Sequence, residues 1–371
     1  MIPAIRPLGA VLFLLGGLSA AHADIRATDS VGRSVVLAQP AKRIVLSDAL
    51  DLIAFSLIDP APAERIAGWS RSRLDDATLA LMQRHDSRLA DIRPLGIIKP
   101  GAVPVELIIA LKPDLVVLGT EFRASEPAIE QLRAARIPVA ILGLAPTLRQ
   151  LDGELGLVAF GRLIGREAEA EAFSTFFRER VSRIRDRVAA RGDARRVPVL
   201  LEAHAGPGTC CTSPGRGEGI GDFVSLAGGD NIGAPVIPGM AGTLSTEYVI
   251  QRKPEVFIAT GGAYMAARGG LVLGTGVGPA EARDSLARIA SRPTLAGLPA
   301  VKAGRVHGIA HALTTSGLNI VAIEAVAQWI APDLFADLDP DATLRLLGER
   351  FLGFQMTGTF TIDLKGKAPG R

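Results

Sequence analysis

Short apolar runs alternate along the chain with longer stretches in which apolar residues recur every three or four positions. Short runs bounded by turn residues predict buried strands, and the stretches between them predict helices. The predicted strands are residues 43–46, 65–69, 115–118 and 139–142 in the first half and 197–203, 256–260 and 306–309 in the second. This alternation predicts an α/β protein with mainly parallel sheets flanked by helices.

The longest amphipathic stretch lies between the two halves, from Glu167 to Ala190. Its apolar residues follow the spacing of one helical face, at Ala170, Phe173, Phe177, Val181, Ile184 and Val188. A helix of this length would measure about 36 Å. We expect a rigid strut that joins two lobes, although a helix that covers one sheet would show the same pattern.

One segment occurs twice at a lobe-sized spacing. Residues 106–117 read Glu-Leu-Ile-Ile-Ala-Leu-Lys-Pro-Asp-Leu-Val-Val, and residues 247–258 read Glu-Tyr-Val-Ile-Gln-Arg-Lys-Pro-Glu-Val-Phe-Ile. Proline cannot continue a helix, and the branched residues after it favour a strand. Each copy therefore predicts the same helix, proline stop and strand, once in each half of the chain.

The amino terminus has the pattern of an export signal. Arg6 is followed by an apolar run at residues 8–18 and by the small-residue cleavage pattern Ala21-His22-Ala23. The run is too short to span a bilayer, and no cysteine follows it to accept a lipid. We predict a cleavable signal peptide at 1–23, an N-terminal lobe at 24–165, the connecting helix at 166–191, and at 192–371 a C-terminal lobe that ends in helices. The mature chain is expected in the periplasm.

The charge and the cysteine content limit which classes of partner and metal site this chain can have. The chain carries 41 basic and 38 acidic side chains, a net charge of +3, which argues against nucleic acid as a partner. The two cysteines, Cys210 and Cys211, are adjacent, which excludes a multi-cysteine metal site. A strained vicinal disulfide and two small thiols in a turn both remain open, and we favour the turn.

Three further segments carry a family resemblance: Asp29-Ser-Val-Gly-Arg33, Pro40-Ala-Lys-Arg-Ile-Val45 and Leu226-Ala-Gly-Gly-Asp-Asn-Ile232. Together with the repeat and the central helix, they make the chain resemble the substrate-binding proteins of iron-siderophore, haem and cobalamin ABC importers. The resemblance implies two lobes joined by one long helix. It also implies that Glu106 and Glu247 dock onto basic residues of an inner-membrane permease, although a carboxylate in a first helical turn also gains from the helix dipole.

Candidate ligand contacts follow from the rule that ligands bind beyond the carboxyl ends of the strands. Arginines there would pair with an anionic chelate, flat rings would cover its body, and a tyrosine or histidine would serve as an axial ligand of haem. The predicted ligand-binding residues are Asp48, Trp69, Arg71, Lys99, Glu121, His204, Thr212, Arg216, Tyr264, Arg268 and His311.

We therefore expect a monomeric periplasmic receptor that captures a ferric siderophore, or alternatively cobalamin or haem, and delivers it to a permease. The unusual segment 210–218 leaves the identity of the chelate open. Glycine-rich runs at 215–221 and 269–276 lack the lysine and serine of a phosphate loop, so we expect no catalysis and no cofactor. No His-His-Glu/Asp constellation has a convincing spacing, so we expect no metal bound directly by the protein. A sensor or scaffold of the same fold is the other open interpretation.

Overall fold

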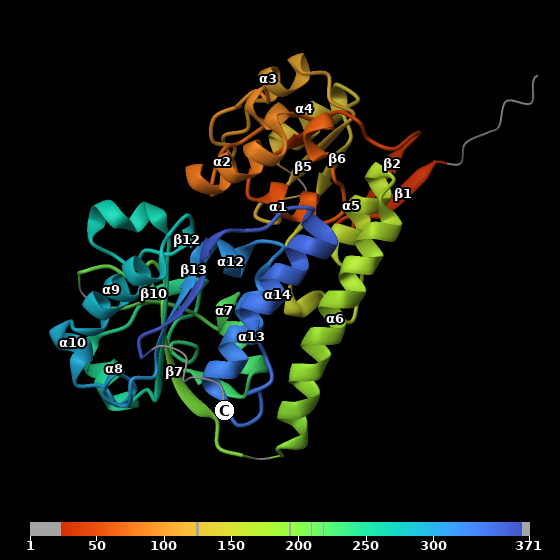
Figure 1. Cartoon of the computed structure of the whole chain (residues 1–371). Helices are drawn as coiled ribbons and strands as arrows, with labels where there is room; N and C mark the ends of the chain where they lie inside the picture. Colours follow the sequence, from red (N-terminus) through yellow and green to blue (C-terminus); the bar gives the residue numbers. More distant parts are fainter. Residues whose placement is uncertain (1–23, 124–125, 193, 209, 218, 366–371) are drawn as a thin grey trace, which may run out of the picture.

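The computed structural model describes residues 24–123, 126–192, 194–208, 210–217 and 219–365 (Figure 1). The predicted signal peptide lies outside these residues. The chain forms two lobes, each built on one central sheet, and the predicted α/β class with mainly parallel sheets is confirmed.

The N-terminal lobe contains a four-stranded parallel sheet in the order β4-β3-β5-β6. A β-hairpin of β1 and β2 lies beside it. The strands are β1 (Ile25–Thr28), β2 (Ser34–Leu37), β3 (Ile44–Leu46), β4 (Ile66–Trp69), β5 (Leu115–Leu118) and β6 (Val139–Ile141), and the helices are α1 (Asp51–Ser56), α2 (Asp76–His85), α3 (Val105–Ala110), α4 (Pro127–Ala134) and α5 (Gly156–Ile164). Apolar side chains cover both faces of this sheet, which accounts for the unbroken hydrophobic runs of its strands.

The C-terminal lobe contains a five-stranded sheet in the order β15-β13-β11-β7-β9, in which only β15 is antiparallel. The strands of this sheet are β7 (Val197–Glu202), β9 (Gly229–Asn231), β11 (Val256–Gly261), β13 (Val306–Ala310) and β15 (Thr361–Asp363). Two small antiparallel pairs lie outside it. One joins β8 (Thr212–Pro214) to β10 (Ala241–Thr243), and the other joins β12 (Gly274–Thr275) to β14 (Gly358–Thr359). The helices are α7 (Ile220–Leu226), α8 (Thr246–Arg252), α9 (Pro279–Ala290), α10 (Pro293–Ala296), α11 (Pro299–Ala303), α12 (His311–Thr315), α13 (Asn319–Ile330) and α14 (Pro340–Leu347).

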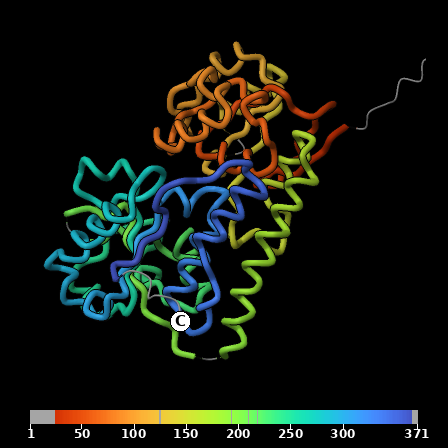
Figure 2. The backbone as a smooth tube through the Cα atoms, viewed as in Figure 1, coloured from red at the N-terminus to blue at the C-terminus, as the bar shows by residue number. Residues whose placement is uncertain are grey.

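The long helix α6 (Glu167–Ala190) has the predicted bounds and runs along both lobes (Figure 2). It buries Phe173, Phe177 and Val181 on its inner face. It packs on α5 at the N-terminal lobe and on α13 at the C-terminal lobe, where Arg180 pairs with the buried Glu324 at 2.5 Å. The two lobes are therefore joined by a continuous helix with side-chain contacts to each.

The repeated segment forms the same unit twice, as α3 followed by β5 and as α8 followed by β11. In both copies the lysine after the helix has a left-handed backbone, with φ of +49° at Lys112 and +48° at Lys253. The proline that follows prevents a further helical turn. The matching backbone conformations show that the two sequence copies are structurally equivalent.

The structure also contains elements that the hydrophobic pattern did not predict, among them β12, β14 and β15. These strands are two or three residues long, so they show no periodicity in the sequence. The end of the chain returns to the C-terminal lobe through β14, which pairs with β12, and through β15, which joins the five-stranded sheet. Within the described residues, no helix is both long and apolar enough to cross a membrane.

Candidate functional site

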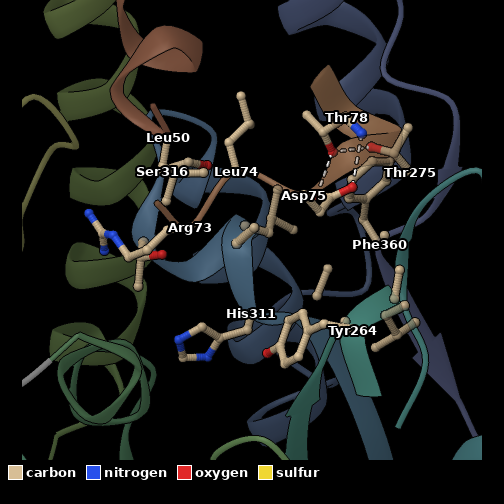
Figure 3. Close-up of a pocket in the computed structure, with 18 of the residues that line it drawn as sticks. Leu50, Arg73, Leu74, Asp75, Thr78, Tyr264, Thr275, His311, Ser316 and Phe360 are labelled. Atoms are coloured by element: carbon tan, nitrogen blue, oxygen red, sulfur yellow. Dashed lines mark hydrogen bonds between the residues drawn. The ribbon is translucent and has the colours of Figure 1, made fainter. Parts of the chain in front are cut away.

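A cavity of about 520 Å³ lies between the two lobes (Figure 3). The N-terminal lobe contributes α1 and the start of α2 to its wall, through Leu50, Ile53, Arg73, Leu74, Asp75 and Thr78. The C-terminal lobe contributes the ends of its central strands and two apolar side chains from the end of the chain, Met356 and Phe360. Its size and largely apolar lining are those of a small-molecule site.

Two histidines and a tyrosine meet on the C-terminal side of this cavity. His204 follows β7, Tyr264 follows β11, and His311 follows β13. These three strands are neighbours in the sheet, so their carboxyl ends lie side by side. The rings of His204 and His311 are 4.0 Å apart, and the Tyr264 hydroxyl lies 2.5 Å from Nδ1 of His204.

Thr260, at the end of β11, positions both histidines. Its buried Oγ1 accepts the backbone N–H of His204 at 3.1 Å and lies 3.1 Å from Nδ1 of His311. Neither Nε2 atom has a hydrogen-bond partner among the described residues. Both imidazoles are therefore oriented through Nδ1 and keep Nε2 available.

The three rings are neutral near pH 7. Burial, together with the nearby His204 and Arg73, lowers the pKa of His311 to about 4. Burial also lowers the pKa of His204 and raises the pKa of Tyr264 to about 12. A neutral imidazole binds a metal through its unprotonated nitrogen, so Nε2 of each histidine can bind when Nδ1–H of His204 donates to the Tyr264 hydroxyl and Nδ1–H of His311 donates to Thr260.

The opposite wall is charged. Arg73 pairs with Asp48, which is buried at the end of β3. Asp51 lies close by at the start of α1, where burial and the neighbouring carboxylates of Asp48 and Glu121 raise its pKa to about 8 despite the opposing effect of Arg73. Arg73 is the only arginine or lysine on the cavity wall among the described residues.

Backbone conformation also distinguishes this site. Arg73 and His204 have φ values of +61° and +51°, which side chains other than glycine rarely adopt. Gly262 leaves room for the Tyr264 ring, because a Cβ atom there would overlap the ring. Unusual backbone of this kind clusters at functional sites.

The structure brings three of the predicted ligand residues, His204, Tyr264 and His311, onto the cavity wall and sets Asp48 behind Arg73. Trp69 lies in the core with 1% of its surface exposed, so it presents no face to the cavity. The other predicted residues do not line the cavity, and all of them are exposed: Arg71, which pairs with Asp76, and Lys99, Glu121, Thr212, Arg216 and Arg268.

Sequence reasoning missed Arg73, Thr260 and the apolar wall formed by Met356 and Phe360. Arg73 lies only two residues from the predicted Arg71, and the turn that directs it inward leaves no pattern in the sequence. Thr260 was the last residue of a predicted strand, the position from which ligand contacts begin. Nothing in the sequence indicated that the C-terminal residues return to the cleft.

The adjacent cysteines form a vicinal disulfide, the alternative that the sequence analysis did not favour. Cys210 and Cys211 are buried beside the carboxylate of Glu202, and in the described part of the chain these three residues are the one group of three or more close histidine, cysteine, aspartate or glutamate ligands. Glu202 is paired with the buried Arg292, with one contact at 2.8 Å. All these donor atoms are already engaged, so the group presents no open metal site.

Comparison with known proteins supports the architecture. A family model described as periplasmic binding protein matches residues 71–312. A TroA-like periplasmic binding protein, FepB from Veillonella parvula, is similar in structure, with a TM-score of 0.82 and 24% identity over 92% of this chain and 99% of that one. A periplasmic heme binding protein from Pseudomonas aeruginosa is similar over 87% of this chain and 98% of that one, with a TM-score of 0.52 and 20% identity.

A curated relative is similar in sequence. A cobalamin-binding protein of Halobacterium salinarum is 32% identical over 162 residues, which is 43% of this chain. The match spans 41% of the length of that relative. At these identities the solved structures establish the fold, and the bound molecules belong to the relatives.

Proposed function

Since this chain belongs to the periplasmic binding protein family of ABC importers, we propose that its cleft captures a metal chelate outside the inner membrane and delivers it to a permease. The observation that carries the proposal is the neutral cluster of His204, Tyr264 and His311 in a largely apolar cavity between the lobes. Such a site supplies donors for a metal and an apolar surface for the body of its chelator.

A free metal ion is a poorer fit to this cavity. Asp75 is the one carboxylate on the wall within the described residues, and it already accepts hydrogen bonds from the backbone and hydroxyl of Thr78. Hard cations require several oxygen ligands. The metal is therefore expected to arrive with most of its coordination already filled.

Among chelates, we favour a metal tetrapyrrole such as haem or a corrin. Its flat body matches an apolar cleft, and its axial position can accept Nε2 of a neutral histidine or a tyrosine oxygen. Arg73 on the opposite wall can pair with a carboxylate side arm, because its Nη1 has no partner among the described residues. A cobalamin-binding relative supports the same ligand class.

A ferric siderophore, the cargo expected first from the sequence, is the second candidate. That expectation relied on several cationic side chains in the cleft, whereas the described cavity wall holds one, Arg73. The observation in its favour is that Arg73 can pair with chelating oxygens.

Export and delivery complete the proposal. We propose that the signal pattern at residues 1–23 directs export to the periplasm, that the protein acts there as a monomer, and that Glu106 and Glu247 dock it onto the permease. Both carboxylates are exposed in equivalent units, and neither has an ion-pair partner among the residues that the structure describes. Receptor function, in preference to catalysis or sensing, is the role that these features support together.

Isothermal titration calorimetry tests the proposal with the purified protein and a panel of haemin, cyanocobalamin, ferric enterobactin, ferrichrome and free Fe³⁺ and Zn²⁺. Calorimetry is preferred to tryptophan fluorescence because Trp69 and Trp329 both lie away from the cavity wall. We expect saturable binding of one chelate and no binding of either free ion. Binding of a free ion alone, or of nothing in the panel, would overturn the proposal.

A further inference from the structure

The exposed apolar side chains of this protein gather in its two repeated units. Six of the nine large hydrophobic side chains that are exposed in the described residues lie on α3 and α8 or in the ten residues that precede each of these helices. We call the three in the N-terminal lobe, Ile97, Leu107 and Ile109, the N-terminal patch, and the three in the C-terminal lobe, Val236, Met240 and Ile250, the C-terminal patch. Isolated exposed apolar residues are ordinary, but two sets on equivalent units require an explanation.

The two patches are built alike. Ile109 and Ile250 occupy the same position of the repeat and are 38% and 55% exposed, while their neighbours Ile108 and Val249 are buried in both copies. Each exposed isoleucine follows its glutamate, Glu106 or Glu247, by three positions. Residues at this spacing share one face of a helix, so each unit presents a glutamate and an isoleucine together.

The loop before each helix adds to its patch. In the N-terminal lobe Ile97 is 72% exposed, and the adjacent Ile98 packs in the same core as Ile108 of α3. In the C-terminal lobe Met240 is 74% exposed and directly precedes β10, which leads into α8. The Tyr248 hydroxyl of α8 donates to the carbonyl of Ile232 at 2.8 Å and holds the loop against the helix.

We propose that these two patches are apolar anchors that insert into two equivalent pockets of the importer permease, each bordered by a basic side chain that faces Glu106 or Glu247. This inference rests on the proposed function. Two equivalent patches fixed on one rigid molecule match a partner that offers the same site twice, as a permease made of two like subunits does. Unpaired carboxylates beside the anchors complement basic groups on that partner.

The glutamates and the isoleucines contribute to binding in different ways. An exposed ion pair adds little affinity and is screened by salt, so the glutamates accelerate and orient the encounter. Apolar anchors that become buried carry most of the affinity of an interface. The complex is therefore held mainly by the isoleucines and keeps its affinity at high salt.

The test measures binding of the fluorescently labelled protein to right-side-out inner-membrane vesicles of the source organism, at low and high salt. Ile109→Ser and Ile250→Ser together should weaken binding about 100-fold at both salt concentrations, since each removes an anchor. Val36→Ser is the matched control, because Val36 is 39% exposed on β2, outside the repeated units. Glu106→Gln and Glu247→Gln together should slow association chiefly at low salt.

Each outcome separates the inference from the proposed function. If the wild type binds the vesicles and the double isoleucine variant binds equally well, the anchors are excluded and the receptor function stands. If the wild type does not bind at all, the proposed function falls and the inference falls with it. If sedimentation shows a wild-type dimer that the isoleucine variant loses, the patches join two copies of this chain, and the permease anchor is overturned. Unchanged chelate binding and melting temperature exclude misfolding of the variant.

Discussion

The hydroxyl oxygens of Thr78 and Thr275 lie 2.7 Å apart and join the first turn of α2 in the N-terminal lobe to β12 in the C-terminal lobe (Figure 3). Both side chains are buried, and both line the cavity. Asp75 caps α2 and accepts hydrogen bonds from the backbone and hydroxyl of Thr78, so the Thr78 oxygen accepts the hydrogen bond from the Thr275 hydroxyl. One side of the cleft is therefore closed by a direct polar contact between the lobes.

Thr275→Val should lower the free energy of unfolding by about 1 kcal/mol, because it removes this contact while it preserves the shape of the side chain. Urea unfolding of the purified protein measures the change. Thr275→Ser, which retains the hydroxyl, is the control and should lose less. Equal stability of the valine variant and the wild type would show that the contact does not hold the lobes together.

Asp51→Asn should stabilise the protein near pH 8 and have little effect near pH 4. The pKa of Asp51 rises from an ordinary value of 3.8 to about 8 on folding, chiefly through burial. The folded state therefore binds the proton more tightly, and stability is lost as the pH rises through this interval. Asparagine remains neutral, so the gain should grow by up to about 1.4 kcal/mol for each pH unit across this interval.

Unfolding curves across this pH range test the prediction for Asp51. Asp76→Asn is the matched control, because Asp76 lies in the same lobe with a fully solvated side chain. The assignment fails if Asp51→Asn and Asp76→Asn change the pH profile of stability in the same way.

His311→Asn should remove a loss of stability that the wild type shows in acid. The pKa of His311 falls from 6.5 to about 4 on folding, because of burial and the neighbouring His204 and Arg73. The unfolded chain therefore takes up the proton first, and stability decreases as the pH falls from about 6.5 to about 4. Thermal unfolding at several pH values measures this slope, and His85→Asn, an exposed histidine, should retain it.

The buried pair of Glu202 and Arg292 should be costly to break. Burial raises the pKa of Glu202, and Arg292 opposes that rise. Arg292→Met leaves a buried carboxylate without its partner and should cost about 3–5 kcal/mol. Arg195→Met, which breaks the exposed pair with Glu255, should cost less than about 1 kcal/mol. Equal losses for the two variants in urea unfolding would contradict this account.

The sequence predicted the elements of the fold better than their arrangement. The bounds of α6 were predicted because its buried residues follow one helical face over 24 residues. The central strands were predicted because their apolar runs end at turn residues. The order of those strands was not predicted, since parallel neighbours are paired by contacts between distant parts of the chain.

The residues of the site could also be predicted better than their arrangement. His204, Tyr264 and His311 were each predicted because each follows a strand, but no sequence spacing indicated that the three would meet. Their meeting depends on the order β13-β11-β7. Trp69 also ends a strand, yet its side chain lies in the core, because neighbouring positions of a strand point to opposite faces. Position along the chain alone does not distinguish these two outcomes.

The central claim is that the histidine and tyrosine cluster ligates the metal of a bound chelate. Absorption and electron paramagnetic resonance spectra of the protein with ferric haemin test it most directly, in the wild type and in His204→Ala, Tyr264→Phe and His311→Ala. We predict an axially ligated haem spectrum in the wild type that at least one of these substitutions changes to a different ligation state, whereas His85→Ala leaves it unchanged. Spectra that are identical in all variants, or a wild-type spectrum identical to that of free haemin, would contradict the claim.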